Sequence, residues 1–412
     1  LVEKLEGELN PDSIAEAEAF VKAYKPVREN SGLEENAPAS TALYAKSSAL
    51  PKPMKNRSSR KARVESIASG GGRQRIYDAV SRGLEWLKAN QDDDGSWGAN
   101  DKRSGLPFST DKNAMTGMAL LCFLGHGQLQ DSPGYGITVR RAIESLISTP
   151  PDSGITQGNR GSYSHPIRTY ALCEAYAMTK QRKLKPFAEK ATEAIIKGQH
   201  ESGGWAYGYR KGPTAHVDLS VTGWNVQALK AATLTGLRLD GLELAMDKAM
   251  AYVKRCQDED GKFAYKEGTS GKASLTGAGV LCLQLWKNAK SLEVQKGLEW
   301  IVSNQAGEWS KVNAYEWYYH AQACFQATGV NGGTKYWKAW NENFQEILLK
   351  TQAGDGHWPQ GAHFHGDTDL YRTTMTILML EVFYRYLPFA YVSPTADQLQ
   401  LPPSPQGSSQ KK

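Results

Sequence analysis

A short helix-and-turn segment that recurs along the chain constrains the fold more than any other feature. GLEWLKANQ at 83–91 returns as GLEWIVSNQ at 297–305, with six of nine positions identical. Each copy ends an amphipathic helix and runs into a turn. Related turns lie at 91–98, 150–166, 199–208, 257–265, 304–309 and 351–360. Six turns at intervals of roughly fifty residues are typical of a repeat architecture.

Each period predicts two helices of different character. The helix before a turn is amphipathic and charged, and the helix after it is more apolar and richer in small residues. This contrast predicts charged helices outside and apolar helices inside. The outer helices are expected at 75–90, 137–148, 185–198, 242–256, 292–304 and 336–351, and the inner helices at 113–124, 166–178, 218–234, 272–286, 313–327 and 369–387.

Six helical hairpins in sequence can stack as an open solenoid or close into a double ring. An open solenoid needs polar capping repeats at its ends, and neither end of the repeat region contains one. The sequence therefore predicts an all-α fold, an (α/α)6 toroid that spans residues 73–390.

The segments on either side, 1–72 and 391–412, are expected to lie outside the toroid. One helix is predicted at 13–24, where Ser13 and Glu16 have capping-box spacing. Residues 29–72 are predicted to be a flexible basic linker, because 46–63 contains seven cations and no acid. The C-terminal tail is rich in Pro, Ser and Gln and is predicted to be disordered.

Composition argues against several classes of function. The net charge of +6 over 412 residues is mild and does not by itself indicate nucleic-acid binding. No apolar run reaches the roughly 18 residues that a membrane-spanning helix needs. The five cysteines include no CxxC pair, which argues against a structural zinc ribbon or a thioredoxin-like site.

The turns carry a known motif. Q-x-x-x-G-x-W occurs at 91–97, 199–205 and 352–358, and 257–263 keeps the spacing with Phe in place of Trp. This is the QW motif of the squalene–hopene and oxidosqualene cyclases, with weaker forms in protein prenyltransferase β subunits. The chain therefore resembles the terpenoid cyclase/protein prenyltransferase α/α-toroid superfamily over about 73–390.

The motif also has a direct physical interpretation. The Gln side chain can bond backbone groups at adjoining helix ends, which otherwise lack partners. The Gly permits a tight reversal, and the Trp packs on the preceding helix. We therefore interpret these turns as staples between repeats, and we assign no catalytic role to their aromatic residues or to Asp92–Asp94.

The catalytic motifs of the superfamily are missing. Class II terpenoid cyclases protonate an alkene with the middle Asp of D-x-D-D, which does not occur here. Its nearest counterpart is Asp367-Thr368-Asp369, at the start of the last inner helix. The D-x-C zinc motif of protein prenyltransferases and the C-G-E-Q thioester motif are also absent. The resemblance therefore implies the fold, and no metal or cofactor is predicted.

A site is expected at one rim of the ring. Alternation of outer and inner helices makes all inner helices parallel, so that their N-termini, the positive ends of their dipoles, share one rim. Polar residues of unusual type gather there and in the adjoining lumen. The candidate catalytic residues are His216, His365, Asp367 and Asp369, and the candidate substrate-binding residues are Arg168, Trp317, Tyr318, Tyr319, Tyr371 and Arg372.

Three interpretations of this rim remain open. The acids can be helix N-caps, each worth about 1 kcal/mol, which accounts for Asp111 and Asp218 as single residues. His216, Asp218 and the His and Asp residues of 363–369 can ligate a metal. Alternatively, a His beside a carboxylate exchanges a proton with a substrate, whose anionic group Arg168 and Arg372 bind. The lumen aromatics line a pocket in this last case and fill the core in the first.

Three functions follow from these interpretations. The first is a squalene-cyclase- or prenyltransferase-like toroid that binds or transforms an apolar or anionic small molecule at the rim. The second is a non-catalytic scaffold that reaches a protein partner through its linker. The third, by fold analogy alone, is a polysaccharide lyase-like enzyme. The absence of an initiator Met and the basic linker are compatible with an exported or periplasmic bacterial protein tethered by an upstream segment.

Overall fold

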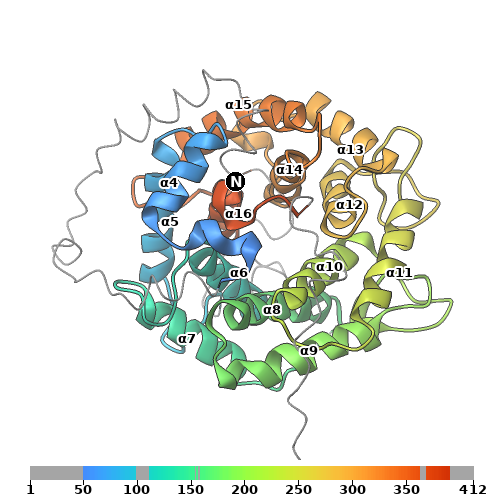
Figure 1. Cartoon of the computed structure of the whole chain (residues 1–412), viewed down its shortest axis with the longest axis horizontal. Helices are drawn as coiled ribbons and strands as arrows, with labels where there is room; N and C mark the ends of the chain where they lie inside the picture. Colours follow the sequence, from blue (N-terminus) through green and yellow to red (C-terminus); the bar gives the residue numbers. More distant parts are fainter. Residues whose placement is uncertain (1–49, 99–110, 154, 156–157, 362–367, 390–412) are drawn as a thin grey trace, which may run out of the picture.

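The computed structural model describes residues 50–98, 111–153, 155, 158–361 and 368–389. Figure 1 shows two concentric layers of helices around a common axis. The outer layer contains α5 (Arg75–Ala89), α7 (Gly136–Ile147), α9 (Lys185–Gly198), α11 (Leu242–Arg255), α13 (Leu292–Ser303) and α15 (Thr334–Thr351). The inner layer contains α6 (Lys112–Gly125), α8 (Gly158–Thr179), α10 (Leu219–Thr233), α12 (Ala273–Leu285), α14 (Ala314–Ala327) and α16 (Asp369–Leu380).

The two layers differ in burial as the sequence predicts. In α6 every residue from Ala114 to Gly125 is buried, so this helix has no solvent-facing side. The outer helix α5 instead buries a stripe that contains Ile76, Val80, Leu84 and Leu87 and leaves its charged face to solvent. Outside the helices, the described residues form isolated β-bridges and no named strand. The all-α fold is thus confirmed.

The ring is closed by contacts between its first and last helices. The inner helix α16 packs against α6 as well as against its sequence neighbour α14, and the outer helix α15 packs against α5. Cys122 Sγ lies 3.4 Å from the Thr374 carbonyl across this seam. The toroid predicted in place of an open solenoid is confirmed, while the count of six hairpins stays a prediction.

The turn glutamines are the staples that the motif predicts. Gln91 Nε2 donates to the carbonyl of Gly95 in its own turn at 2.9 Å and to the carbonyl of Thr138 on the next outer helix at 3.0 Å. The same pair of bonds recurs at Gln199, Gln257 and Gln352. For Gln352 the next outer helix is α5, where Ala79 O accepts at 2.8 Å. One amide group thus joins consecutive repeats and also closes the ring.

The glycine and the tryptophan complete each turn. Gly356 has φ of +101°, and an added Cβ would lie 2.4 Å from the Arg82 carbonyl oxygen. Trp358 is buried and donates its Nε1 hydrogen to Leu348 O at 2.8 Å on the preceding outer helix. Its backbone N–H bonds Thr373 Oγ1 at 3.0 Å on the following inner helix. The turn therefore ties the outer and inner helices of one hairpin together.

The described part of the predicted linker is folded, which corrects the prediction for residues 50–72. This segment forms η1 (Lys52–Arg57) and α4 (Arg60–Ser69), and Ser59 Oγ caps α4 at 3.1 Å from Ala62 N. Met54 and Arg57 are fully buried. A flexible linker would leave its basic residues in solvent, whereas Arg57 and Arg63 are buried and hydrogen-bonded. The predicted helix 13–24, residues 29–49 and the C-terminal tail lie outside the described residues.

The inner helix α8 begins earlier than predicted. It starts at Gly158 rather than near Pro166, which lies inside the helix. The added turns pack against η3 (Tyr207–Tyr209) of the next hairpin, and Ser162 Oγ accepts from Gly208 N at 2.7 Å. Packing against this neighbour sustains a helix that the proline alone would not predict.

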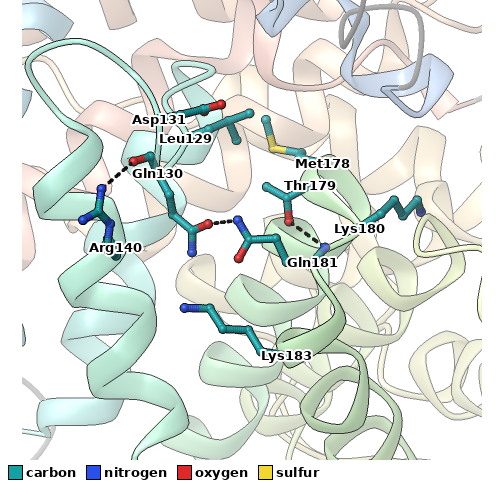
Figure 2. A pocket seen from close by; sticks show the side chains of 9 residues that line it. All are labelled: Leu129, Gln130, Asp131, Arg140, Met178, Thr179, Lys180, Gln181 and Lys183. Atoms are coloured by element: carbon teal, nitrogen blue, oxygen red, sulfur yellow. Dashed lines mark hydrogen bonds between the residues drawn. The ribbon is translucent and has the colours of Figure 1, made fainter. Parts of the chain in front are cut away.

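The two ends of the ring differ in what covers them. The inner-helix N-termini form one rim. At the opposite end, η1, α4 and α17 (Val382–Arg385) pack together across the inner-helix C-termini. A surface pocket opens on this second side, between the α6–α7 loop and the end of α8 (Figure 2). No helix of the described chain has both the length and the apolar character needed to cross a bilayer.

Candidate functional site

The rim formed by the inner-helix N-termini is lined with helix caps. Asp111 Oδ1 accepts from Ala114 N at 2.9 Å, and Asp218 Oδ1 accepts from Ser220 N at 2.7 Å. The interpretation of these two acids as N-caps is confirmed. Asn313 caps α14 and Thr368 caps α16 in the same way. Capping therefore accounts for much of the polar character of this rim.

Asp218 is also the centre of a wider group, which we call the Asp218 cluster: His216, Asp218, Ser220, Tyr163 and Tyr207. Asp218 is 2% exposed. Its Oδ2 accepts from the Tyr207 hydroxyl at 3.1 Å and lies 3.6 Å from His216 Nε2. The Tyr163 hydroxyl lies 2.9 Å from that of Tyr207 and 2.8 Å from Ser220 Oγ. Residues of α8, η3 and α10 thus converge on one carboxylate.

The electrostatics of the Asp218 cluster keep its tyrosines protonated. Burial, and after it the charge of Asp218, raises the pKa of Tyr207 to about 12. Burial likewise raises the pKa of Tyr163 well above its usual range, with further contributions from Tyr207 and Asp218. Both hydroxyls are therefore hydrogen-bond donors to the cluster at neutral pH. His216 is the exposed member, with 56% of its side chain accessible to solvent.

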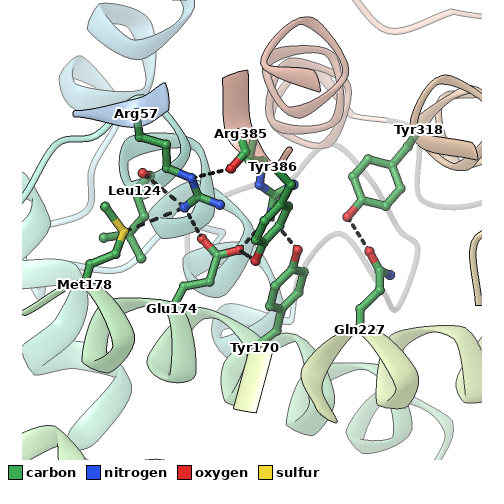
Figure 3. A network of polar contacts seen from close by, with 9 residues as sticks. All are labelled: Arg57, Leu124, Tyr170, Glu174, Met178, Gln227, Tyr318, Arg385 and Tyr386. Atoms are coloured by element: carbon green, nitrogen blue, oxygen red, sulfur yellow. Dashed lines mark hydrogen bonds and ion pairs between the residues drawn. The ribbon is translucent and has the colours of Figure 1, made fainter. Parts of the chain in front are cut away.

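Two of the predicted substrate-binding tyrosines lie in the lumen. The Tyr318 hydroxyl donates to Gln227 Oε1 at 2.9 Å, and Gln227 Nε2 donates to the Tyr319 hydroxyl at 3.0 Å. Figure 3 shows the first of these contacts. Trp224 stacks on Tyr318 with ring centroids 5.6 Å apart. These aromatics fill the lumen, and Gln227 bonds the hydroxyls of both tyrosines. They are all fully buried in the described structure.

Trp317 lies outside the lumen, which corrects its placement as a substrate-binding residue. Its ring packs on Trp340 and Phe344 of the outer helix α15, at centroid distances of 5.2 and 6.3 Å. Successive residues of a helix point in directions about 100° apart, so the neighbour of a lumen residue can face the outer layer. Trp317 is therefore core between the two layers.

The two arginines predicted to bind an anionic group hold backbone carbonyls instead. Arg168 donates to Thr149 O at 2.6 Å and Pro150 O at 2.8 Å. Arg372 donates to Val312 O at 2.8 Å and lies over the Trp309 ring, 4.4 Å from its centroid. Carbonyls in loops need donors when they are buried, and Arg168 supplies them to the degenerate turn at 150–166. These contacts correct the prediction that Arg168 and Arg372 bind an anionic group of a substrate.

The last predicted group is only partly described. Asp369 Oδ1 accepts from Gln360 N at 2.8 Å, so this carboxylate orders the turn before α16. Tyr371 is buried in the first turn of α16. His363, His365 and Asp367 lie outside the described residues. Among the described residues, no cluster of three or more His, Cys, Asp or Glu side chains could hold a metal ion.

Sequence reasoning missed a buried charge network at the other end of the lumen (Figure 3). Arg57 Nη1 lies 2.5 Å from Glu174 Oε2, and Arg385 Nη2 lies 3.3 Å from Glu174 Oε1. The Tyr386 hydroxyl also donates to Glu174 Oε1. Burial alone would raise the pKa of Glu174, but the charges of the two arginines outweigh it, so that this pKa lies below its usual value. A Glu within the apolar run ALCEAYAM was the available signal.

Next to this network the lumen is nearly full. A cavity bordered by Tyr170, Gln227, Lys230, Tyr386 and Phe389 has a volume of about 10 Å³, roughly the room that one water needs. Burial lowers the pKa of Lys230 to about 8, and its ammonium lies 4.3 Å from the centre of the Phe389 ring. This part of the lumen has no space for a hydrocarbon substrate.

Comparison with known proteins gives the class to which this fold and its turns belong. The chain belongs to the prenyltransferase alpha-alpha toroid domain family, whose model matches residues 78–336. It is similar to the squalene–hopene cyclase of Zymomonas mobilis, with 26% identity over 247 residues, covering 57% of this chain and 30% of that protein. It is also similar to the squalene–hopene cyclase of Bradyrhizobium diazoefficiens, with 30% identity over 188 residues, covering 38% and 26%. The chain thus spans less than a third of the length of these relatives.

Solved structures share the fold at low sequence identity. The GH76A α-1,6-mannanase of Salegentibacter sp. HEL1_6 matches with a TM-score of 0.56 and 11% identity, covering 74% of this chain and 98% of that one. A possible GH105 member from Salmonella enterica matches with a TM-score of 0.52 and 14% identity, covering 75% and 93%. These likenesses establish the α/α toroid and nothing about activity.

Proposed function

We propose that this toroid binds a small ligand at the rim of its inner-helix N-termini and that the Asp218 cluster is the centre of that site. The observation that carries the proposal is the contact between an exposed imidazole and a buried carboxylate, with His216 Nε2 3.6 Å from Asp218 Oδ2. Capping of α10 needs the carboxylate alone and does not require His216, Tyr207 or Tyr163 beside it.

The geometry suits proton exchange with a polar ligand. His216 is half-exposed, so a ligand at the rim can reach it. Asp218, held by Ser220 and Tyr207, can orient the imidazole. The positive end of the α10 dipole faces the same place and favours a ligand with negative or electron-rich groups.

A cyclase reaction on a long hydrocarbon fits less well. The chain has no D-x-D-D motif, and the described lumen contains an ion network and a cavity of about 10 Å³. Hydroxyl, imidazole and carboxylate groups at the rim suit a hydroxylated ligand, as they can both donate and accept hydrogen bonds. The polysaccharide-active alternative therefore stays open as a second candidate, with the tethered scaffold as the non-catalytic one.

Calorimetric titration with squalene and with α-1,6-mannotetraose tests this proposal. Asp218→Asn is the sharpest variant, because Asn caps a helix about as well as Asp while the charge is lost. Binding of either probe that weakens in Asp218→Asn and His216→Gln, and not in the remote surface variant Lys296→Gln, supports the rim site. Binding that is equal in all four proteins would place the ligand elsewhere, and no binding by either probe would favour the scaffold.

A further inference from the structure

The surface pocket of Figure 2 is a second binding site that the rim does not explain. It has a volume of about 620 Å³, within the range of pockets that bind small molecules. Its wall comes from the α6–α7 loop, α7, the end of α8 and η2 (Arg182–Leu184). From Tyr163 of the Asp218 cluster to Thr179 in the pocket, α8 runs about 24 Å. The two sites are therefore separate.

One part of the pocket wall is rich in unused hydrogen-bond donors. Arg140 makes one long contact, from Nη2 to Gln130 O at 3.4 Å. Lys183 Nζ lies 3.8 Å from Glu144 Oε1, and both side chains are about half-exposed, so this pair contributes little. Gln130 Nε2 is buried and has no hydrogen-bond partner within the described structure. Figure 2 shows Arg140 and Lys183 around the contact between Gln130 and Gln181.

The other part of the wall is apolar. Leu129 and Met178 are each 7% exposed and border the same cavity. Asp131 lies at this edge, next to Leu129 in Figure 2. Lys180 turns away, donating from Nζ to Thr235 O at 2.6 Å in the next hairpin. The pocket therefore has a cationic end at Arg140 and Lys183 and an apolar end at Leu129 and Met178.

We propose that this pocket binds a small amphipathic carboxylate. Its carboxylate would accept from the Arg140 guanidinium, the Lys183 ammonium and the Gln130 amide, which are donors of the kind that hold carboxylates. Its apolar body would cover Leu129 and Met178. The inference does not depend on the proposed function of the rim, because no residue is shared.

Calorimetry with octanoate, using octan-1-ol as the ligand that lacks the carboxylate, tests the proposal on the full chain. Octanoate is expected to bind more tightly than octan-1-ol, and more weakly as salt is raised. The double variant Arg140→Gln/Lys183→Gln is expected to weaken octanoate binding by roughly tenfold or more and to leave octan-1-ol unchanged. The matched control, Lys190→Gln/Lys197→Gln on the neighbouring α9, removes the same charge and is expected to bind octanoate like the parent.

A second variant tests the position of the ligand. Thr179→Phe places a ring in the cavity and is expected to abolish binding of both ligands, while the thermal unfolding midpoint reports that the fold persists. Equal affinity for octanoate and octan-1-ol would overturn the proposal. So would octanoate binding that survives the double variant, or that is unaffected by Thr179→Phe.

Discussion

Arg57 and Glu174 form a buried ion pair between residues 117 positions apart in the sequence, with 2.5 Å between Nη1 and Oε2. Both side chains are fully buried. The pair fastens the segment before the toroid to the C-terminal part of the inner helix α8. Arg385 and Tyr386, which follow the last inner helix, bind the same carboxylate. Both flanks of the ring thus meet on one residue of α8.

We expect Arg57→Met to destabilise the protein by about 2–3 kcal/mol, since the buried Glu174 carboxylate loses its 2.5 Å partner and keeps only Arg385 and Tyr386. Lys61→Met is the matched control, because Lys61 pairs with Glu65 at 3.7 Å in an exposed position and should change stability by at most about 0.5 kcal/mol. Urea denaturation of both variants measures the difference. Equal losses would show that the network does not hold the segment to the ring.

Glu316 is expected to make stability fall as pH rises. Burial raises its pKa from 4.5 to about 7, so the folded protein keeps a proton that the unfolded chain has lost between these values. Stability linked to Glu316 is complete below pH 4.5 and is lost as pH rises through 7, by about 3 kcal/mol. Glu316→Gln should therefore be more stable than the parent at pH 8 and equal to it at pH 4.

Unfolding curves of Glu316→Gln at both pH values provide the measurement. The control is Glu193→Gln, whose side chain is half-exposed and pairs with Lys197 within one helix. Its difference from the parent should be small and should not grow between pH 4 and pH 8. A stability difference between Glu316→Gln and the parent that stays the same at pH 4 and pH 8 would contradict the raised pKa of Glu316.

Gln352 closes the ring, so its loss should destabilise the whole toroid. Gln352→Ala removes the bonds from Nε2 to Gly356 O and Ala79 O, both 2.8 Å long, and is expected to cost about 1–3 kcal/mol. Gln295→Ala removes one 3.4 Å contact on an exposed surface and should be close to neutral. The measurement is the thermal unfolding midpoint of each variant. Similar midpoints for the two would argue against a role of Gln352 in joining the ends of the ring.

Substitution by alanine should change the stability of the protein differently at two glycines of the same turn. Gly356 has φ of +101° and no room for a Cβ next to Arg82 O, whereas a Cβ on Gly354 meets nothing within 4 Å. Gly356→Ala is expected to cost at least about 2 kcal/mol, and Gly354→Ala should be neutral or slightly stabilising. The denaturant midpoints of the two variants measure this difference. A midpoint of Gly356→Ala equal to that of the parent would mean that the turn can relax.

Much of the fold was predictable because the staples are local. Each Gln, Gly and Trp lies within seven residues, and the helices on either side show the periodicity of their layer. The order of the helices follows from such signals repeated along the chain, and ring closure from the lack of polar capping repeats at either end. Where the local signal was misleading, as at Pro166 inside α8 and in the basic segment 50–72, packing against a distant element outweighed it.

The site was less predictable for a geometric reason. The sequence placed His216 and Asp218 on one rim, and these two residues do lie together. The sequence does not specify on which face of an inner helix each side chain lies. Trp317 therefore lies between the layers, next to the lumen residue Tyr318, and Arg168 and Arg372 hold loop carbonyls.

The sequence by itself determined the class of fold, its repeat and the chemistry of its turns, because these depend on residues close together in the chain. Only the tertiary structure decided what the polar residues do. Arg57, Glu174 and Arg385 lie far apart in sequence, and their charges are tolerable only because folding brings them within hydrogen-bonding distance. Burial of charge depends on such long-range partners, which no local pattern specifies.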